Sequence, residues 1–233
     1  MRKLCILAIL CVTLITPTYA GLLDDFGIFL KKSPDENTVI AGLKEALTVG
    51  TENAVGSVSQ VDGYFGNEII KILMPEKIQK VADVLGKVGY QQQVDDFILS
   101  MNRAAEKAAP EALSIFIDAV KDMTFQDARG ILSGGDTAAT DYFETKTSDT
   151  LYERFKPIIA SSMNEVGVTR AYKDMMGKYL SLPLMQAESL DLDHYVTNKS
   201  LEGLFYMVGE EEKKIRTNPA ARVTDLLKTV FGK

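Results

Sequence analysis

The sequence is poor in the residues that usually build metal centres and disulfide frameworks. It has two cysteines, Cys5 and Cys11, one histidine, His194, and no tryptophan. Both cysteines lie within the first twenty residues, so the rest of the chain has no thiol nucleophile, no disulfide and no cysteine-ligated metal. We therefore expect no cofactor, and we expect a hydrophobic core to stabilise the fold.

Long hydrophobic runs and clusters of basic residues are also missing after the first twenty residues. The chain has 26 Lys and Arg residues against 32 Asp and Glu residues, which gives a formal net charge of -6. An acidic chain without a basic cluster is not typical of proteins that bind nucleic acid or anionic membranes. No later stretch is long and apolar enough to cross a bilayer. We therefore expect no nucleic-acid partner and no transmembrane segment in the mature chain.

The first twenty residues have the pattern of a cleaved export signal. Arg2 and Lys3 precede an almost unbroken apolar stretch over 4–15, and Thr18 and Ala20 form an A-x-A-like cleavage site. The apolar stretch is too short to span a bilayer, so we predict cleavage after Ala20 and export to the periplasm or out of the cell. Arg2 and Lys3 are the only charged residues of this segment, so cleavage changes the net charge from -6 to -8.

Residues 21–233 are predicted to fold as one all-helical domain, with a C-terminal subdomain at 191–233 as an open alternative. Apolar residues recur at helical spacing, and no convincing second strand accompanies the short β-branched run at 69–73. We expect a compact bundle of about ten short helices, in particular over 21–32, 38–58, 75–88, 91–109, 148–166, 169–180 and 198–216.

Lipidation of the N-terminal segment at Cys11 is disfavoured, because Leu10 is bulky where that processing needs a small residue.

The centre of the predicted fold is a helical hairpin over residues 123–147. Thr124 and Asp127 predict a capped start of a short helix, and the Gly-Gly pair at 134–135 predicts its end. Asp136 predicts the N-cap of a second short helix. An anion site at that N-terminus is the alternative, but the segment lacks the lysine of a phosphate-binding loop, and Asp136 would repel a phosphate.

Two stretches depart from a regular helical pattern. Pro157 lies inside the apolar stripe of the helix over 148–166, so we expect a kink or a break there. Residues 59–74 contain glycines and the adjacent aromatics Tyr64 and Phe65, which suit a structured loop. These aromatics either plug the core, which is the preferred interpretation, or are exposed for partner contact.

Polar residues on two helices are the other candidates for a recognition site. Arg103 and Glu106 are three residues apart and can pair on a helix surface, as can Glu212 and Arg216, which are expected to solvate their helix. Structural networks are the more frequent explanation of such clusters, and a polar recognition site is the alternative. The candidate interaction residues are Tyr64, Phe65, Asn102, Arg103, Glu106, Arg216, Arg222 and Asp225.

The only histidine gives a weak indication of catalysis or metal binding. His194 follows Asp191 and Asp193, and a catalytic triad would combine it with a serine such as Ser189 or Ser200. Neighbouring residues of one helix rarely converge on a single ion, and helix capping explains the two aspartates equally well. We expect no metal site and no catalytic residues.

Several short segments are distinctive in combination. They are GLKEAL at 42–47, SMNRAAE at 100–106, MT, DA and IL within 123–132, AATDYF at 138–143, GLF at 203–205, IRTNP at 215–219 and LLKTVF at 226–231. Through them the chain resembles, over about residues 35–232, a bacterial family of exported all-helical proteins known only as a domain of unknown function. The resemblance implies an exported helical domain and carries over no activity.

The sequence as a whole predicts a non-catalytic binding or interaction protein of the bacterial cell envelope. The partner is either an unidentified envelope protein or, alternatively, a small apolar ligand held between helices. A weaker alternative is a hydrolase that uses carboxylates such as Glu106 and Asp127. A large lined cavity in the structure would favour the carrier. Carboxylates that converge in a cleft would favour the enzyme. A solid core with an exposed aromatic patch would favour the interaction protein.

Overall fold

The computed structural model describes residues 35–165, 167–182 and 190–218, together with Thr224 and Lys228. These residues belong to one compact unit of the chain. Within them all regular structure is helical, which confirms the all-α prediction. The helix expected over 21–32 lies outside the described residues, as do residues 183–189 and most of the chain after Asn218.

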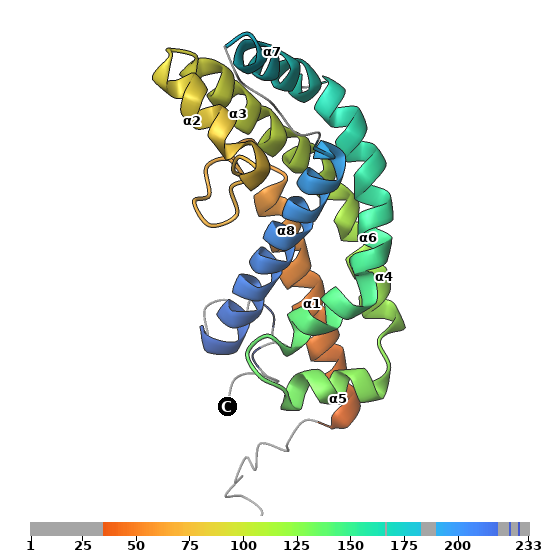
Figure 1. The fold of residues 1–233 in the computed structure, drawn as a ribbon. Helices are drawn as coiled ribbons and strands as arrows, with labels where there is room; N and C mark the ends of the chain where they lie inside the picture. Colours follow the sequence, from red (N-terminus) through yellow and green to blue (C-terminus); the bar gives the residue numbers. More distant parts are fainter. Residues whose placement is uncertain (1–34, 166, 183–189, 219–223, 225–227, 229–233) are drawn as a thin grey trace, which may run out of the picture. The chain divides into compact units, whose positions relative to one another are not determined.

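Among the described residues the α-helices are fewer than the predicted set of about ten, and two are longer than predicted (Figure 1). The second helix of the predicted hairpin and the helix over 148–166 are continuous in α6, with 28 residues, and the helix over 198–216 begins earlier, at Leu192, in α8, with 26 residues. The α-helices are α1 (Glu36–Val58), α2 (Gln79–Lys87), α3 (Gln91–Ala108), α4 (Ala112–Asp122), α5 (Phe125–Ser133), α6 (Ala138–Glu165), α7 (Val168–Leu180) and α8 (Leu192–Thr217), with short 3-10 helices η2 (Glu76–Ile78) and η3 (Ala109–Glu111).

Helix α6 runs without interruption through Pro157, so of the predicted kink or break the break is wrong. Figure 1 shows it as one long, bent helix. A proline inside a helix costs about 3 kcal/mol, because one backbone hydrogen bond is lost and the ring crowds the preceding turn. Phe155 and Ile159 on either side of the proline are completely buried. The burial of this apolar face offsets the cost and keeps the helix continuous.

The predicted central hairpin is present only in its first half. The capping box forms, since Thr124 Oγ1 accepts the Asp127 N–H at 3.1 Å and the Asp127 carboxylate accepts the Thr124 N–H at 3.0 Å. Gly134 follows with φ of -81°, so the corner needs no left-handed glycine. The second helix is the start of the long α6. The packing of α6 and α8 against α1 and α3 forms the centre of the fold.

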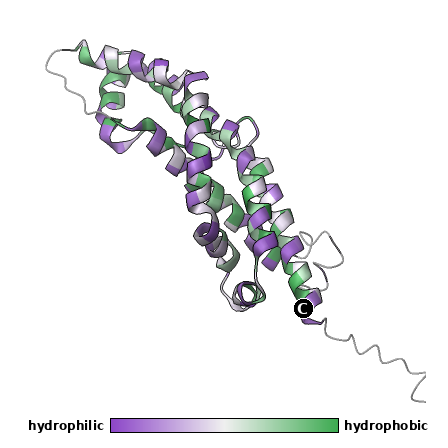
Figure 2. Ribbon diagram, turned by 90° about the vertical axis from the view of Figure 1, so that its right-hand side faces the viewer, coloured by the Kyte–Doolittle hydropathy of each residue, from purple (hydrophilic) through white to green (hydrophobic). Residues whose placement is uncertain are grey.

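An aromatic cluster lies where α4, α6 and α8 meet. The ring of Phe116 is 5.1 Å from that of Phe143 and 6.0 Å from that of Phe205, both in edge-to-face arrangements. Such pairs add to the burial of apolar area. Because Phe205 belongs to α8, residues 192–217 share the core of the preceding helices. Figure 2 shows hydrophobic residues interleaved with hydrophilic ones along the helices. None of the described helices is apolar enough over sufficient length to cross a membrane.

Candidate functional site

The segment over residues 59–75, between α1 and the 3-10 helix η2, is held by a buried carboxylate of α3. Glu106 has a side chain only 5% exposed. Its Oε1 accepts the backbone N–H groups of Tyr64 at 3.1 Å and of Phe65 at 3.2 Å. Its Oε2 accepts Arg103 Nη1 at 2.6 Å, and Arg103 Nη2 donates to Asp62 at 2.7 Å. Four predicted candidates thus come together, and their hydrogen bonds fix the backbone of this segment.

Asn102, which forms a polar stripe on α3 together with Arg103 and Glu106, holds the far end of the same segment. Its Oδ1 accepts the Ile72 N–H, and its Nδ2 donates to the Ile72 carbonyl, each at 2.8 Å. The amide also donates to the Ile98 carbonyl within α3 at 2.8 Å. Every polar atom of this fully buried side chain is therefore paired, which is what burial of an amide requires.

Tyr64 is a plug in the hydrophobic core, as the preferred interpretation of the aromatic pair has it. Its side chain is fully buried, and its hydroxyl donates to the Ser200 carbonyl of α8 at 2.6 Å. Burial and the nearby Glu106 carboxylate raise the pKa of Tyr64, so it remains a neutral donor. Gly203 makes room for it, because a Cβ there would lie 2.8 Å from the Tyr64 ring.

Phe65, the second residue of the aromatic pair, lies half-buried at the surface of the segment. Lys71 Nζ is 3.8 Å from the centroid of its ring, and the Arg103 guanidinium carbon is 5.8 Å away. Both cations lie within the range of a cation–π interaction. Phe65 therefore contributes to the fixed shape of the segment.

A groove of about 720 Å³ lies between the end of this segment and α8. Three large apolar side chains at the groove are exposed, Ile69 by 68%, Leu73 by 60% and Tyr206 by 39%. Tyr195 joins the two sides, since its hydroxyl donates to the Leu73 carbonyl at 3.1 Å. The remaining lining residues are Ile70, Lys71, Ile72, Met74, Pro75, Glu76, Lys77, Leu190, Lys199, Glu202 and Gly203.

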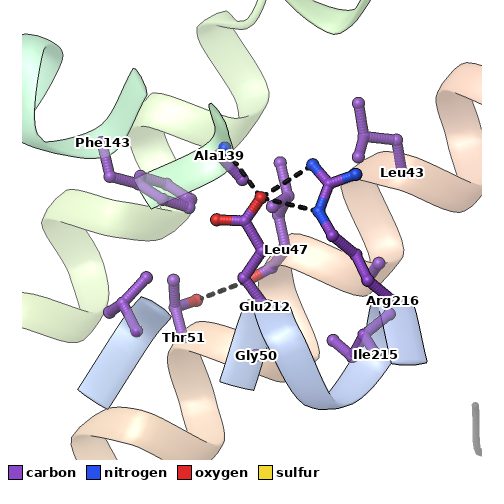
Figure 3. Close-up of a pocket in the computed structure, with 11 residues that line it drawn as sticks. Leu43, Leu47, Gly50, Thr51, Ala139, Phe143, Glu212, Ile215 and Arg216 are labelled. Carbon is purple, nitrogen blue, oxygen red and sulfur yellow. Dashed lines mark hydrogen bonds and ion pairs between the residues drawn. The ribbon is translucent and has the colours of Figure 1, made fainter. Parts of the chain in front are cut away.

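A second buried carboxylate occupies the N-terminus of α6 (Figure 3). Glu212 of α8 accepts the N–H groups of Ala139 at 3.0 Å and Thr140 at 2.9 Å, as well as the Thr140 hydroxyl at 2.8 Å. The predicted cap, Asp136, makes none of these bonds. The carboxylate is favoured there because the first amides of a helix lack intrahelical acceptors and carry partial positive charge.

Arg216 completes this arrangement at the C-terminal end of α5. Its guanidinium donates to Glu212 at 2.7 and 2.9 Å and to the Ile131 carbonyl at 3.1 Å. The side chains of Glu212 and Arg216 are only 5% and 18% exposed, so the expectation that they solvate α8 is wrong. The other members of the predicted C-terminal group, Arg222 and Asp225, lie outside the described residues.

A cavity adjoins this ion pair on its apolar side. It has a volume of about 30 Å³ and is lined by residues of α1, α6 and α8, among them Leu47, Thr51 and Phe143 (Figure 3). A space of this size holds about one water molecule. Pockets for small molecules are typically about ten times larger or more. The cavity therefore gives no support to a carrier of an apolar ligand.

His194 links α8 to α6 at the surface. Its Nδ1 is 2.7 Å from the Tyr152 hydroxyl, and its Nε2 is 3.0 Å from Asn198 Nδ2. Asp191 is the N-cap of α8 and accepts the His194 N–H at 3.0 Å, so capping does explain this aspartate. Ser200 Oγ donates to a carbonyl within α8, and Ser189 lies outside the described residues. Among the described residues, no group of three or more His, Cys, Asp or Glu residues could hold a metal ion.

The two carboxylates proposed for a hydrolase have separate partners on separate helices. Glu106 on α3 is bonded to Arg103 and to the Tyr64 and Phe65 backbone, as described above. Asp127 on α5 belongs to the capping box, and its hydrogen bonds to the side chain and backbone of Thr124 lower its pKa. These contacts stabilise local structure, so they give no support to a shared catalytic role.

Comparison with known proteins places the fold in a family. A family model described as "Protein of unknown function (DUF4197)" matches residues 33–232. The chain belongs to this family. The match covers almost the same range as the resemblance seen in the sequence, about 35–232, and the family description assigns no activity. No curated protein and no solved structure matches the chain.

Two features of this DUF4197 protein are missed by sequence reasoning. The buried Glu212 could have been found, because it lies four residues after the buried Val208 and three before Ile215, on the apolar stripe of α8. The groove depends on Leu73 and Tyr206, which come from separate parts of the chain. The only local signal is the β-branched run at 69–73, whose length does not distinguish a strand from a helical turn.

Proposed function

We propose that this protein is a non-catalytic binding protein of the bacterial cell envelope, and that it contacts a partner protein through the groove between residues 69–77 and α8. The observation that carries the proposal is the exposure of Ile69, Leu73 and Tyr206 around one groove. Single exposed apolar residues are normal, whereas a group of them beside a groove is typical of an interaction site.

The rigid attachment of the groove wall also supports a binding role. The segment that carries Ile69 and Leu73 is fixed by Glu106, Asn102 and the buried Tyr64. A surface that is ordered before binding loses less conformational entropy when the partner docks. The polar stripe on α3 thus contributes to binding by preorganising the segment.

The placement in the cell envelope is supported by the sequence of the first twenty residues. The Arg2-Lys3 pair, the apolar stretch and the small residues at Thr18 and Ala20 have the order of a cleaved signal. N-terminal sequencing of the protein from the periplasmic fraction should show a chain that starts at Gly21. An intact Met1, or a protein found only in the cytoplasm, would contradict export.

The binding role can be tested by site-specific photo-crosslinking in living cells. A photoreactive phenylalanine analogue at Tyr206 should give crosslinked adducts of discrete mass. The same analogue at Val88, which is 48% exposed and is not among the residues that line the groove, is the matched control and should give none. Equal yields at the two positions, or no adduct at Tyr206, would contradict the proposal.

A further inference from the structure

The chain around Ile72 has the hydrogen-bonding pattern of a β-strand that is paired along one edge only. Both the N–H and the C=O of Ile72 bond to the Asn102 amide of α3 at 2.8 Å. In a trans peptide unit the C=O and the following N–H point in opposite directions, and the described residues contain no cis peptide bond. The Lys71 C=O and the Leu73 N–H must therefore point away from Asn102.

These two backbone groups lie on the edge that borders the groove. The Leu73 C=O, on the same edge, accepts a hydrogen bond from Tyr195 of α8, which lines the groove. Within the described part of the chain, the Lys71 C=O and the Leu73 N–H have no hydrogen-bond partner. They flank Ile72 in the way that allows one residue of an added parallel strand to bond to both.

The side chains of this stretch alternate as in a strand that is buried on one face. Ile70, Ile72 and Met74 are between 1% and 6% exposed. Ile69, before them, and Leu73, between Ile72 and Met74, are at least 60% exposed, and Lys71, between Ile70 and Ile72, is partly exposed. The outward face therefore carries the apolar Ile69 and Leu73 beside a backbone edge with two unpaired groups, the Lys71 C=O and the Leu73 N–H, which is a combination that can receive an added strand.

We propose that the groove binds an extended peptide segment of a partner protein, which adds as a strand to the free edge of residues 71–73. This inference rests on the proposed binding function and specifies how the partner is recognised. Backbone hydrogen bonds to Lys71 and Leu73 hold the peptide, and alternate apolar side chains of the peptide contact Leu73 and Tyr206.

Charge further defines the peptide. The groove is lined by three lysines and two glutamates, although the whole chain is acidic. Lys199 pairs with Glu202, whereas Lys71 and Lys77 form no ion pair within the described residues. A carboxylate in the peptide would complement these two lysines, and its contribution would decrease with added salt.

The test uses peptides selected from a library of random linear 12-residue sequences against the mature full-length protein. The selected peptides should alternate apolar residues and carry at least one Asp or Glu. Calorimetry with one synthetic peptide, N-methylated at a single backbone position in each variant, should show about tenfold weaker binding at the one position whose N–H bonds to the Lys71 C=O and little change at the others. Equal tolerance of N-methylation along the peptide would overturn the proposal.

A variant pair of the protein tests the same bond from the other side. Leu73→Pro removes the free N–H, and Leu73→Ala removes the side chain but keeps the N–H. Proline requires an extended residue before it, which agrees with the burial alternation around Ile72, so we expect the variant to fold. Peptide affinity should fall about tenfold more in Leu73→Pro than in Leu73→Ala. Equal affinities of the two variants would overturn the proposal.

The same experiments separate this inference from the binding function on which it rests. If crosslinking at Tyr206 persists unchanged in Leu73→Pro cells, the groove binds a partner, but not as an added strand. If no crosslink forms at Tyr206, the binding function itself is wrong. If sedimentation shows a dimer that dissociates in Tyr206→Asp, the occupant is a second copy of this chain, and the partner-peptide proposal is overturned.

Discussion

Replacing Glu212 by alanine should lower the free energy of unfolding by about 3–5 kcal/mol, the cost typical of removing one partner from a buried ion pair. Two N–H groups at the start of α6 lose their acceptor, and the Arg216 guanidinium, only 18% exposed, loses its two hydrogen bonds to the Glu212 carboxylate. Urea denaturation monitored by circular dichroism measures the change.

Two control variants make the Glu212 result specific. Asp136→Ala should change stability by no more than about 0.5 kcal/mol, because Glu212 and not Asp136 bonds to the first amides of α6. The double variant Glu212→Ala with Arg216→Ala should cost less than the sum of the single variants, since the two side chains interact directly. An Asp136→Ala effect as large as that of Glu212→Ala would show that the cap is assigned to the wrong residue.

Replacing Glu106 by alanine should lower the free energy of unfolding by about 2–4 kcal/mol. The N–H groups of Tyr64 and Phe65 lose their acceptor, and leaving a buried donor unpaired costs about 1–3 kcal/mol. Arg103 keeps Asp62 as a partner, which limits the loss. Urea denaturation gives the change in stability, and hydrogen exchange should show faster exchange at the Tyr64 and Phe65 amides.

The matched control for Glu106 is Asp62→Asn. Asp62 is 56% exposed and contacts the same arginine, so its loss should cost at most about 1 kcal/mol. The pair of variants distinguishes the buried acceptor from the surface ion pair. If the proposed function is right, Glu106→Ala also weakens crosslinking at Tyr206, because the segment that carries Leu73 is no longer held. Equal destabilisation by the two variants would contradict the role given to Glu106.

The sequence predicted features that depend on local spacing. The helical class follows from apolar periodicity, and the capping box follows from the spacing of Thr124 and Asp127. Arg103 and Glu106 were recognised as a pair three residues apart, which does form, but Glu106 is buried and not on the helix surface as expected. These signals are contained within a few helical turns, so they can be read without knowing which helices are neighbours.

Features that depend on contacts between distant residues were missed. The cap of α6 comes from Glu212, more than seventy residues later in the chain, so local spacing suggested Asp136 instead. Pro157 suggested a kink or a break, but the helix does not break there, because the burial of its neighbours against other helices outweighs the local preference. The groove is formed by outward-facing residues of 69–77 together with residues of α8. The sequence pattern of either segment alone does not indicate a site.

Two contacts of α8 with other parts of the fold require a fixed number of residues between them. Gly203 faces the Tyr64 ring, and Glu212, nine residues later, faces the first amides of α6. At 1.5 Å per residue these points are about 14 Å apart along the helix axis. One inserted or deleted residue between them would turn one contact by about 100° away from its partner. The number of residues between positions 203 and 212 of α8 is therefore fixed by the fold. Residues between these positions can be substituted, but residues cannot be inserted or deleted there without loss of one contact.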